Sequence, residues 1–224
     1  MIQQPSNVAE LRAAWRVVNR VRVEDSPCFK VVNAADASRL YVYGMIGGWD
    51  MDAQEFVQAV HAIDSPTIDL HINSQGGFVW DAVSMYESLR AHPATVRTHV
   101  DGLAASAASF LALAGDTVDT AKGTRWMVHD AQMVAIGSPA DLRESADLGD
   151  AVSNDIAGIY SARAGGSVKS WRTAMTKTTW YSAQEAVDVG LATRVTGNDK
   201  SNSGASNRSR LIKARAAVAL GGVK

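Results

Sequence analysis

A serine and a histidine in the middle of the chain could together support nucleophilic catalysis. Ser106 lies in the small-residue run Gly102–Ser109, and His129 ends the segment Met127-Val128-His129. A serine hydroxyl is a weak nucleophile until a base removes its proton, and an imidazole can be that base. Small neighbours allow a sharp backbone turn and the close approach of a substrate. If the two side chains meet, the chain is a serine hydrolase; if they do not, the run is tight helix packing.

Two segments that follow expected strands, Asn73–Phe78 and the run from Gly102, are candidates for one binding site. In open α/β folds, ligands bind at the carboxyl ends of the strands. We expect Ser106 near the start of a helix, where the dipole and free N–H groups favour a developing negative charge. Gly76-Gly77 could place another N–H there, and two such donors make an oxyanion hole. The pair is also a plausible strand-to-helix turn, which is compatible with that role.

The hydrophobic pattern from Leu40 onward alternates between strand and helix spacing. The first half predicts a strand at Leu40–Tyr43 ending at Gly44, a helix carrying Phe56, Val60 and Ile63, a strand at Ile68–Ile72, a turn at 73–77 and a helix over Val79–Leu89. The second half predicts a strand at Val96–Val100, a helix at Ala104–Ala114 and short strands at Val118–Ala121 and Arg125–Val128. This alternation implies an α/β fold built from right-handed βαβ crossovers.

A long helix is predicted from Pro139 to about Ala164, because proline suits the first turn of a helix. Its expected buried stripe consists of Leu142, Gly149, Val152, Ile156 and Ile159. Further along, the segment Ser182–Glu185 is a capping box that predicts a helix start, and Gly190 is a plausible stop.

Bulk properties favour one soluble domain. The chain has 224 residues, 46% hydrophobic and 20% charged, with a net charge of −1, so nothing global argues for nucleic-acid or membrane partners. The single cysteine, Cys28, excludes an intrachain disulfide and fits a reducing compartment. The N-terminus has no apolar signal core, and the longest apolar run, Leu103–Leu113, is too short to span a bilayer. We therefore expect a cytoplasmic protein.

Four motifs in order resemble the Clp protease proteolytic subunit (ClpP) family, most closely the ClpP-related head-maturation (prohead) proteases of phages and prophages. They are Ile72–Gly77, Gly102–Ser109, Met127–His129, and Trp180–Ala186 with Val189–Ala192, and the resemblance covers roughly residues 40–195. It implies a ClpP/crotonase-like spiral of βαβ units with a protruding helical head element. It also implies a serine endopeptidase without a cofactor, a ring-forming homo-oligomer that is a heptamer or stacked heptamers, and capsid or scaffold proteins as substrates in the host cytoplasm.

The resemblance assigns roles by position. Ser106 takes the nucleophile position and His129 that of the general base, and the N–H groups of Gly77 and Ala107 match the oxyanion hole. The acid that completes the family's triad falls at Thr178, whose hydroxyl can orient an imidazole but cannot neutralise an imidazolium. Loss of that carboxylate costs roughly 10⁴ in rate in well-studied triads.

Three positions depart from the family pattern. Gln75 replaces the usual proline before the two glycines, and Asp130-Ala131 replaces a polar residue and proline after the histidine. The third departure is Thr178. Either another acid acts in its place, with Asp130, Asp155 and Asp116 as candidates, or the enzyme works as a slow dyad.

The expected organisation has three parts: an N-terminal arm at 1–36 that is partly ordered, a peptidase domain at 37–196, and a flexible basic tail at 197–224. Short helices are possible at Asn7–Val18 and Leu211–Leu220. The tail carries six Lys/Arg against one Asp, so it either docks on a partner or is simply solvated.

Two alternatives to a protease stay open. A crotonase-fold acyl-coenzyme A enzyme would share the core and the oxyanion hole without needing the Ser106/His129 pair, and a ring scaffold would keep the fold without activity. Packing roles are expected for Ser109 and for four histidines, His61, His71, His92 and His99. Core or interface roles are expected for four tryptophans, Trp80, Trp126, Trp171 and Trp180. No metal-spaced Cys/His set occurs, and no phosphate-binding loop indicates an ATPase within the chain.

Overall fold

One mixed sheet organises the molecule. The computed structural model describes residues 29–47 and 51–197, and within them eight strands form a sheet whose main path is β1-β2-β3-β4-β5-β8, with β6 paired to β4 and β7. The strands are β1 (Phe29–Val32), β2 (Ser38–Ile46), β3 (Thr67–Gly77), β4 (Thr95–Ala105), β5 (Thr117–Ala121), β6 (Arg125–Val128), β7 (Thr179–Ser182) and β8 (Arg194–Thr196). The pairs β1–β2 and β6–β7 are antiparallel and the others are parallel.

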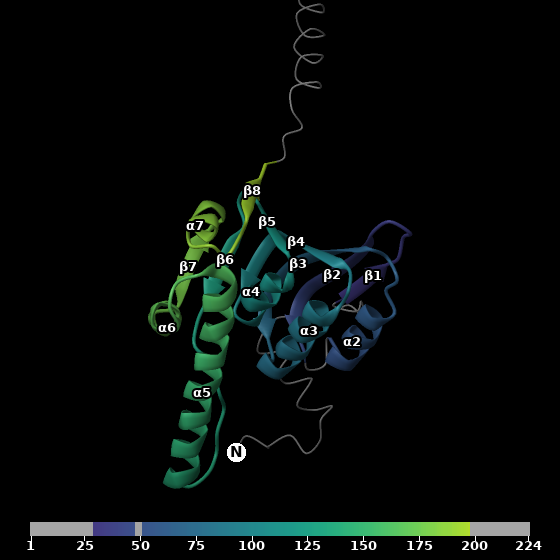
Figure 1. Cartoon of the computed structure of the whole chain (residues 1–224). Helices are drawn as coiled ribbons and strands as arrows, with labels where there is room; N and C mark the ends of the chain where they lie inside the picture. The colour runs from purple at the N-terminus through teal and green to yellow at the C-terminus, as the bar shows by residue number, and fades with distance from the viewer. Residues whose placement is uncertain (1–28, 48–50, 198–224) are drawn as a thin grey trace, which may run out of the picture.

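The helices cover the sheet and extend beyond it. They are α2 (Ala53–His61), α3 (Val79–Ala91), α4 (Ala107–Leu111) with the 3₁₀ turn η1 (Ala112–Ala114), α5 (Pro139–Ala164), α6 (Val168–Thr176) and α7 (Ala183–Asp188). In Figure 1, α2, α3 and α4 lie against the strands, while α5 projects far from the sheet. The α/β fold with a protruding helical element is therefore confirmed.

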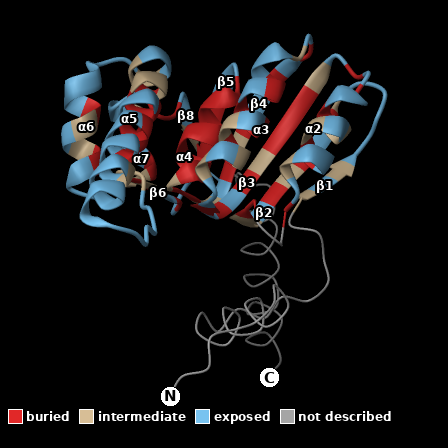
Figure 2. Cartoon of the chain, turned by 90° about the horizontal axis from the view of Figure 1, so that it is seen from below, coloured by how far each residue is buried: buried red, intermediate tan, exposed pale blue. Residues whose placement is uncertain are grey.

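The core lies between the strands and the first three helices. Phe56 of α2, Met85 of α3 and Phe110 of α4 are buried against apolar strand residues such as Leu70 and Val100. Figure 2 shows buried residues concentrated in the central strands and α4, whereas α5 and α6 are mostly exposed. Because parallel strands are buried on their helix-covered face, their apolar residues define this layer.

The turn expected at residues 73–77 is wrong, because β3 continues through Gly77 in parallel pairing with β2. The pairing of β3 is irregular there, with a register shift beyond Tyr43 of β2 and another, against β4, beyond Ile72 of β3. Ser74 Oγ donates to the carbonyl of Gly44 at 2.5 Å and accepts from the N–H of Gly76 at 3.0 Å. A side chain thus supplies hydrogen bonds that keep this polar, glycine-rich segment in the sheet.

The helix expected from Ala104 begins later than predicted. Ala104 and Ala105 belong to β4 and pair with Trp126 and Met127 of β6, and the helix starts at Ala107. Alanine fits either structure, so the tertiary pairing with β6 decides the boundary.

Helix α5 has the predicted bounds, but its predicted buried stripe is only partly right. Gly149, Val152 and Ile156 are buried and Ile159 is partly buried, whereas Leu142 is 44% exposed. The first turns of α5 lie beyond the body of the molecule, as Figure 1 shows, so Leu142 is not enclosed by the core.

Helix α7 was predicted from the sequence, whereas one other helix and three strands were not. Ser182 and Glu185 form the predicted capping box of α7, and Gly190 follows that helix with a φ of 85°. Helix α6 and strands β1, β7 and β8 were not predicted. Strand β1 lies within the expected arm at 1–36 and pairs with β2. The helices expected at 7–18 and 211–220 lie outside the described residues, and within the described part no helix is long and apolar enough to cross a membrane.

Candidate active site

Ser106 occupies a sharp junction between β4 and α4. It is the residue before the first turn of α4, with φ 54° and ψ −128°, and its N–H donates to the carbonyl of Met127 at 2.9 Å. A positive φ is costly for a residue with a side chain and persists only where the surroundings impose it. The predicted position near a helix start is confirmed. The strained turn places Ser106 in the wall of an apolar groove.

His129 reaches Ser106 because β6 lies beside β4. Ala105 of β4 pairs with Met127 of β6, so the residues that follow each strand are neighbours. Nε2 of His129 lies 2.7 Å from Oγ of Ser106, a hydrogen-bond distance. Burial lowers the pKa of His129 below its ordinary value, and the charge of Asp130 partly opposes that shift. A neutral imidazole in this position can accept the serine proton.

Of the two glycines at the end of β3, Gly76 lies against the Ser106 turn and Gly77 lies against β2. A Cβ atom on Gly76 would come within 2.6 Å of the Ala105 carbonyl oxygen and 2.8 Å of the Ala107 nitrogen. One on Gly77 would come within 2.0 Å of the Ile46 carbonyl oxygen. Gly76 also has a φ of 93°, in the left-handed region that favours glycine. Only residues without side chains allow the β3 backbone to come this close to the Ser106 turn and to β2.

Ala107 is the first residue of α4, so its N–H has no partner within the helix. An N–H at a helix start is suited to a developing negative charge. The structure therefore brings together the two segments from which an oxyanion hole was expected.

An apolar groove of about 610 Å³ opens beside the pair, with Ser106 and His129 in its wall. Phe78, Trp80 and Met133 are among its lining residues, and Trp80 is 62% exposed. Trp126 and Trp171 are buried, in agreement with the core role expected of them. Trp80 is not a core residue, because the first turn of α3 faces the groove, and the interface role that was the other expectation for it stays a prediction.

Thr178 lies near His129 but makes no hydrogen bond with it. Val128 pairs with Thr179 in the antiparallel β6–β7 ladder, so the residues just beyond that pair, His129 and Thr178, are adjacent in the fold. Thr178 is exposed and has a positive φ of 52°. Within residues 29–47 and 51–197, the bond to Ser106 is the only hydrogen bond of the His129 side chain.

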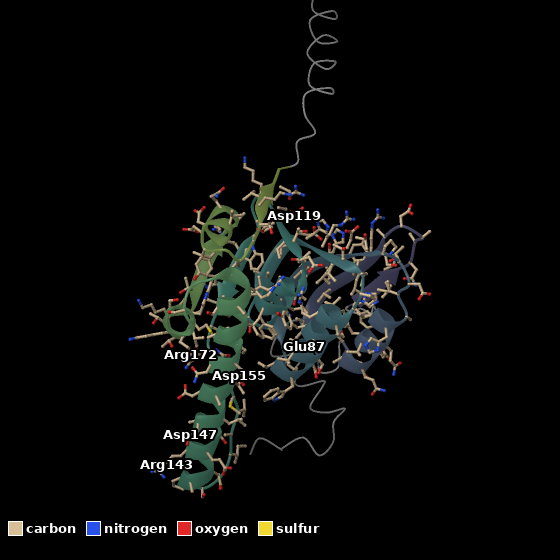
Figure 3. All side chains as sticks on the ribbon, in the orientation of Figure 1. Glu87, Asp119, Arg143, Asp147, Asp155 and Arg172 are labelled. Carbon is tan, nitrogen blue, oxygen red and sulfur yellow. The ribbon has the colours of Figure 1, made fainter. Side chains whose placement is uncertain are left out.

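The three alternative acids lie in different surroundings. Asp116 pairs with Arg90 at 3.0 Å, and Asp155 is exposed on α5, where Figure 3 labels it. Asp130 accepts hydrogen bonds from Arg172 and from Thr176 Oγ1, the latter at 2.9 Å. None of the three is hydrogen-bonded to His129 in the described structure.

Arg172 and Thr176 come from α6, which the sequence did not predict. The available signal was the cap formed by Ser167 and Ser170 at its start, with Trp171 as its apolar anchor. A short helix with few apolar residues gives a weak periodic pattern, so the sequence pattern did not predict α6.

Three of the other histidines make contacts that serve packing. His71 stacks on His99 with ring centroids 4.9 Å apart, and its Nδ1 lies 2.9 Å from Asp101. His92 Nε2 lies 3.1 Å from the carbonyl of Ile63.

Comparisons with known proteins agree on one family. The family model described as Clp protease matches residues 30–199. The chain is 31% identical over 141 residues to the ATP-dependent Clp protease proteolytic subunit 2 of Corynebacterium glutamicum, covering 59% of this chain and 68% of that protein. It is 28% identical over 130 residues to the ATP-dependent Clp protease proteolytic subunit of Pleurastrum terricola, covering 57% and 66%.

A solved structure of a ClpP1 mutant from Listeria monocytogenes has a similar fold. It aligns with a TM-score of 0.64 at 22% identity and covers 71% of this chain and 91% of that one. At this identity the likeness concerns the fold alone.

Proposed function

The chain belongs to the Clp protease family, and we propose that it is a serine endopeptidase that acts through an acyl-enzyme on Ser106. The observation that carries the proposal is the 2.7 Å hydrogen-bond distance between Ser106 Oγ and His129 Nε2. Family membership gives the reaction class, and this pair supplies a nucleophile and a base at one place.

The reaction follows from the positions of these groups. Nε2 of His129 takes the proton of Ser106 as Oγ attacks the substrate carbonyl carbon. The N–H groups of Gly77 and Ala107 stabilise the oxyanion of the tetrahedral intermediate. When the C–N bond breaks, the imidazolium returns the proton to the leaving amine, and water then hydrolyses the ester by the same steps.

The groove supports peptides with apolar side chains as the substrate class. Phe78, Trp80 and Met133 offer apolar surface beside Ser106, and burial of substrate side chains there removes apolar area from water. Within this class, the resemblance to phage head-maturation proteases points to capsid or scaffold proteins as the natural substrates.

A homo-oligomer is part of the proposal. Val134 and Ile136, in the segment before α5, are 96% and 97% exposed, and Leu142 and Leu148 of α5 are exposed as well. Exposed apolar residues grouped along a projecting element favour an interface. A ring of identical subunits, as the resemblance implies, would cover them with a second copy.

The activity is tested by covalent labelling with a fluorophosphonate. We expect the wild-type protein to be labelled and Ser106→Ala to resist labelling. Ser84→Ala is the control, because it removes an exposed serine hydroxyl on a helix, and it should be labelled like wild type. A crotonase-type acyl-coenzyme A enzyme would give no label at Ser106. Absence of label on the assembled wild-type protein would refute the proposal.

The substrate is tested by co-expression with the capsid and scaffold proteins of the same genome. Processing that occurs with wild type and stops with Ser106→Ala supports the proposed substrates. Equal processing with both proteins assigns the cleavage to another enzyme.

A second candidate function, a ring scaffold with little or no activity, is favoured by the surroundings of His129. Within the described residues no carboxylate is hydrogen-bonded to its second ring nitrogen. A scaffold would assemble normally and leave peptide esters intact, so sedimentation and ester hydrolysis on one sample separate the two candidates.

A further inference from the structure

Ser109, one turn beyond the nucleophile, is joined by two hydrogen bonds to the carbonyl oxygen of Ser106. Its Oγ donates to that oxygen at 2.5 Å, and its backbone N–H donates to it at 2.9 Å. Ser109 is fully buried. A packing role alone does not account for these two hydrogen bonds to the backbone of the nucleophile.

Tyr160 of α5 continues this chain of hydrogen bonds. Its hydroxyl oxygen lies 2.6 Å from Ser109 Oγ, although the two residues are 51 positions apart. A serine hydroxyl has one proton, and Ser109 directs it to the Ser106 carbonyl, so the Tyr160 hydroxyl is the donor of this second bond. Burial raises the pKa of Tyr160, which keeps the tyrosine proton in place.

The Tyr160 ring is itself held in place. It packs on the indole of Trp171, from α6, with ring centroids 5.0 Å apart. The indole N–H of Trp171 donates to the carbonyl of Gly165 at 2.6 Å. The hydroxyl of Tyr160 is therefore presented to Ser109 by α5 and α6 together.

The atom that receives these hydrogen bonds belongs to the same peptide group as a candidate oxyanion donor. The carbonyl of Ser106 and the N–H of Ala107 form one planar trans peptide, in which the C=O and N–H bonds point in opposite directions. Holding the oxygen on the interior side therefore holds the N–H on the opposite side. A rotated peptide would present a carbonyl oxygen to the developing negative charge instead of a donor.

This peptide is one that needs to be held. Ser106 has a positive φ, a conformation that a non-glycine residue adopts only when its surroundings impose it. Two donors on its carbonyl oxygen are a direct physical means of imposing it. Hydrogen bonds in series also polarise one another, so the bond from Tyr160 strengthens the one from Ser109.

We propose that Ser109 and Tyr160 are positioning residues that orient the Ser106–Ala107 peptide so that the Ala107 N–H serves the oxyanion hole. This inference rests on the proposed function, because it assigns a role within the same site. Neither residue touches the reacting atoms; both act through the backbone of Ser106.

The test uses Ser109→Ala, Tyr160→Phe and the double variant, in the full-length protein. Ser88→Ala is the matched control for Ser109, because Ser88 is also a buried helical serine whose Oγ donates to a carbonyl three residues earlier, at 2.8 Å. Tyr86→Phe is the control for Tyr160, since Tyr86 is buried in α3. Thermal unfolding of each variant shows that it is folded.

The measurement is kcat and KM on a peptide ester and on its thionoester, in which sulfur replaces the carbonyl oxygen. Sulfur accepts hydrogen bonds weakly, so the thionoester gains little from an oxyanion hole. We expect Ser109→Ala to lose about 10- to 100-fold in kcat on the oxygen ester with KM nearly unchanged, and about threefold or less on the thionoester. Tyr160→Phe should show the same pattern to a smaller degree, and the double variant should match Ser109→Ala because the two act in series.

Equal losses on both esters, or no loss on either, would overturn the inference. A failure of the proposed function is distinguishable, because wild type would then hydrolyse neither ester and take no fluorophosphonate label. In that event a crystal structure of Ser109→Ala still decides the inference. A rotated Ser106–Ala107 peptide supports it and an unchanged peptide refutes it.

Discussion

Arg172 of α6 holds the carboxylate of Asp130, the residue that directly follows His129. The same guanidinium reaches Asp150 of α5 at 3.0 Å, and Thr176 donates to the other oxygen of Asp130. Both oxygens of Asp130 are therefore engaged away from the imidazole. Its charge still favours the protonated form of His129, which is the electrostatic part of what a triad carboxylate does.

The pH dependence of the reaction should reflect the environment of His129. Because burial lowers the pKa of His129, the neutral base persists below pH 6.5, and the acid limb of kcat/KM should have its midpoint below that value. Asp130→Asn removes the charge that favours the imidazolium, so the midpoint should move further down. The rate on the plateau should also fall, because the imidazolium formed during the reaction is less stabilised.

Asp150→Asn is the control for this prediction. Asp150 binds the same guanidinium, but it lies on α5 and does not adjoin His129. Its pH profile should match that of wild type. An acid limb that stays in place in Asp130→Asn would show that the Asp130 charge does not act on the base.

Restoring a carboxylate at Thr178 should raise activity. The β6–β7 register makes residue 178 the neighbour of His129, and aspartate tolerates a positive φ better than a β-branched threonine. We expect Thr178→Asp to increase kcat on a peptide substrate by about tenfold or more, toward the roughly 10⁴ that a triad acid contributes. Thr178→Asn relieves the same backbone strain without adding charge, so it should show little gain. If Thr178→Asp is no faster than Thr178→Asn, residue 178 is excluded as the position of the triad carboxylate.

A side chain at Gly76 should abolish catalysis. Gly76→Ala would place a methyl group within 2.7 Å of Ser106 Cβ and within 2.8 Å of the Ala107 nitrogen, so the nucleophile and the candidate oxyanion donor must shift. We expect kcat to fall by about 100-fold or more, as for the loss of an oxyanion donor. Gly123→Ala is the matched control, since Gly123 has nearly the same φ, 96°, with open space around it. Urea unfolding should show that Gly123→Ala costs only the backbone strain, about 1–2 kcal/mol, and its kcat should be unchanged.

Removal of the Trp80 indole should weaken the binding of apolar peptides. Trp80 lines the groove, so Trp80→Ala should raise KM for substrates with large apolar side chains by about tenfold, which corresponds to roughly 1.4 kcal/mol of lost burial. Substrates with small side chains should respond less. Trp180→Ala provides the comparison, because Trp180 is a similarly exposed tryptophan on β7 outside the groove. Equal effects of the two variants would argue that the groove does not bind the substrate.

Short sequence motifs explain why much of the candidate site could be predicted from the sequence. Ser106 and His129 lie in short motifs of small and apolar residues that predict a helix start near Ser106 and a strand that ends before His129, and these signals can be read without knowledge of the fold. Helix α5 was predicted with its bounds because proline and an apolar stripe mark it locally. The error at residues 73–77 arose because glycine-rich composition predicts a turn, whereas pairing with β2 and the Ser74 hydrogen bonds keep the segment extended.

The sequence by itself determined the order of strands and helices from β2 to α5, the family and the identity of the serine and histidine pair, because periodicity and motif spacing are local properties. Only the tertiary structure decided which groups surround that pair. Arg172 and Tyr160 reach the site from helices whose placement depends on packing over long sequence separations. The absence of a hydrogen-bonded carboxylate at His129, among the described residues, likewise depends on side-chain directions. Such contacts result from the meeting of distant segments, and no local pattern encodes them.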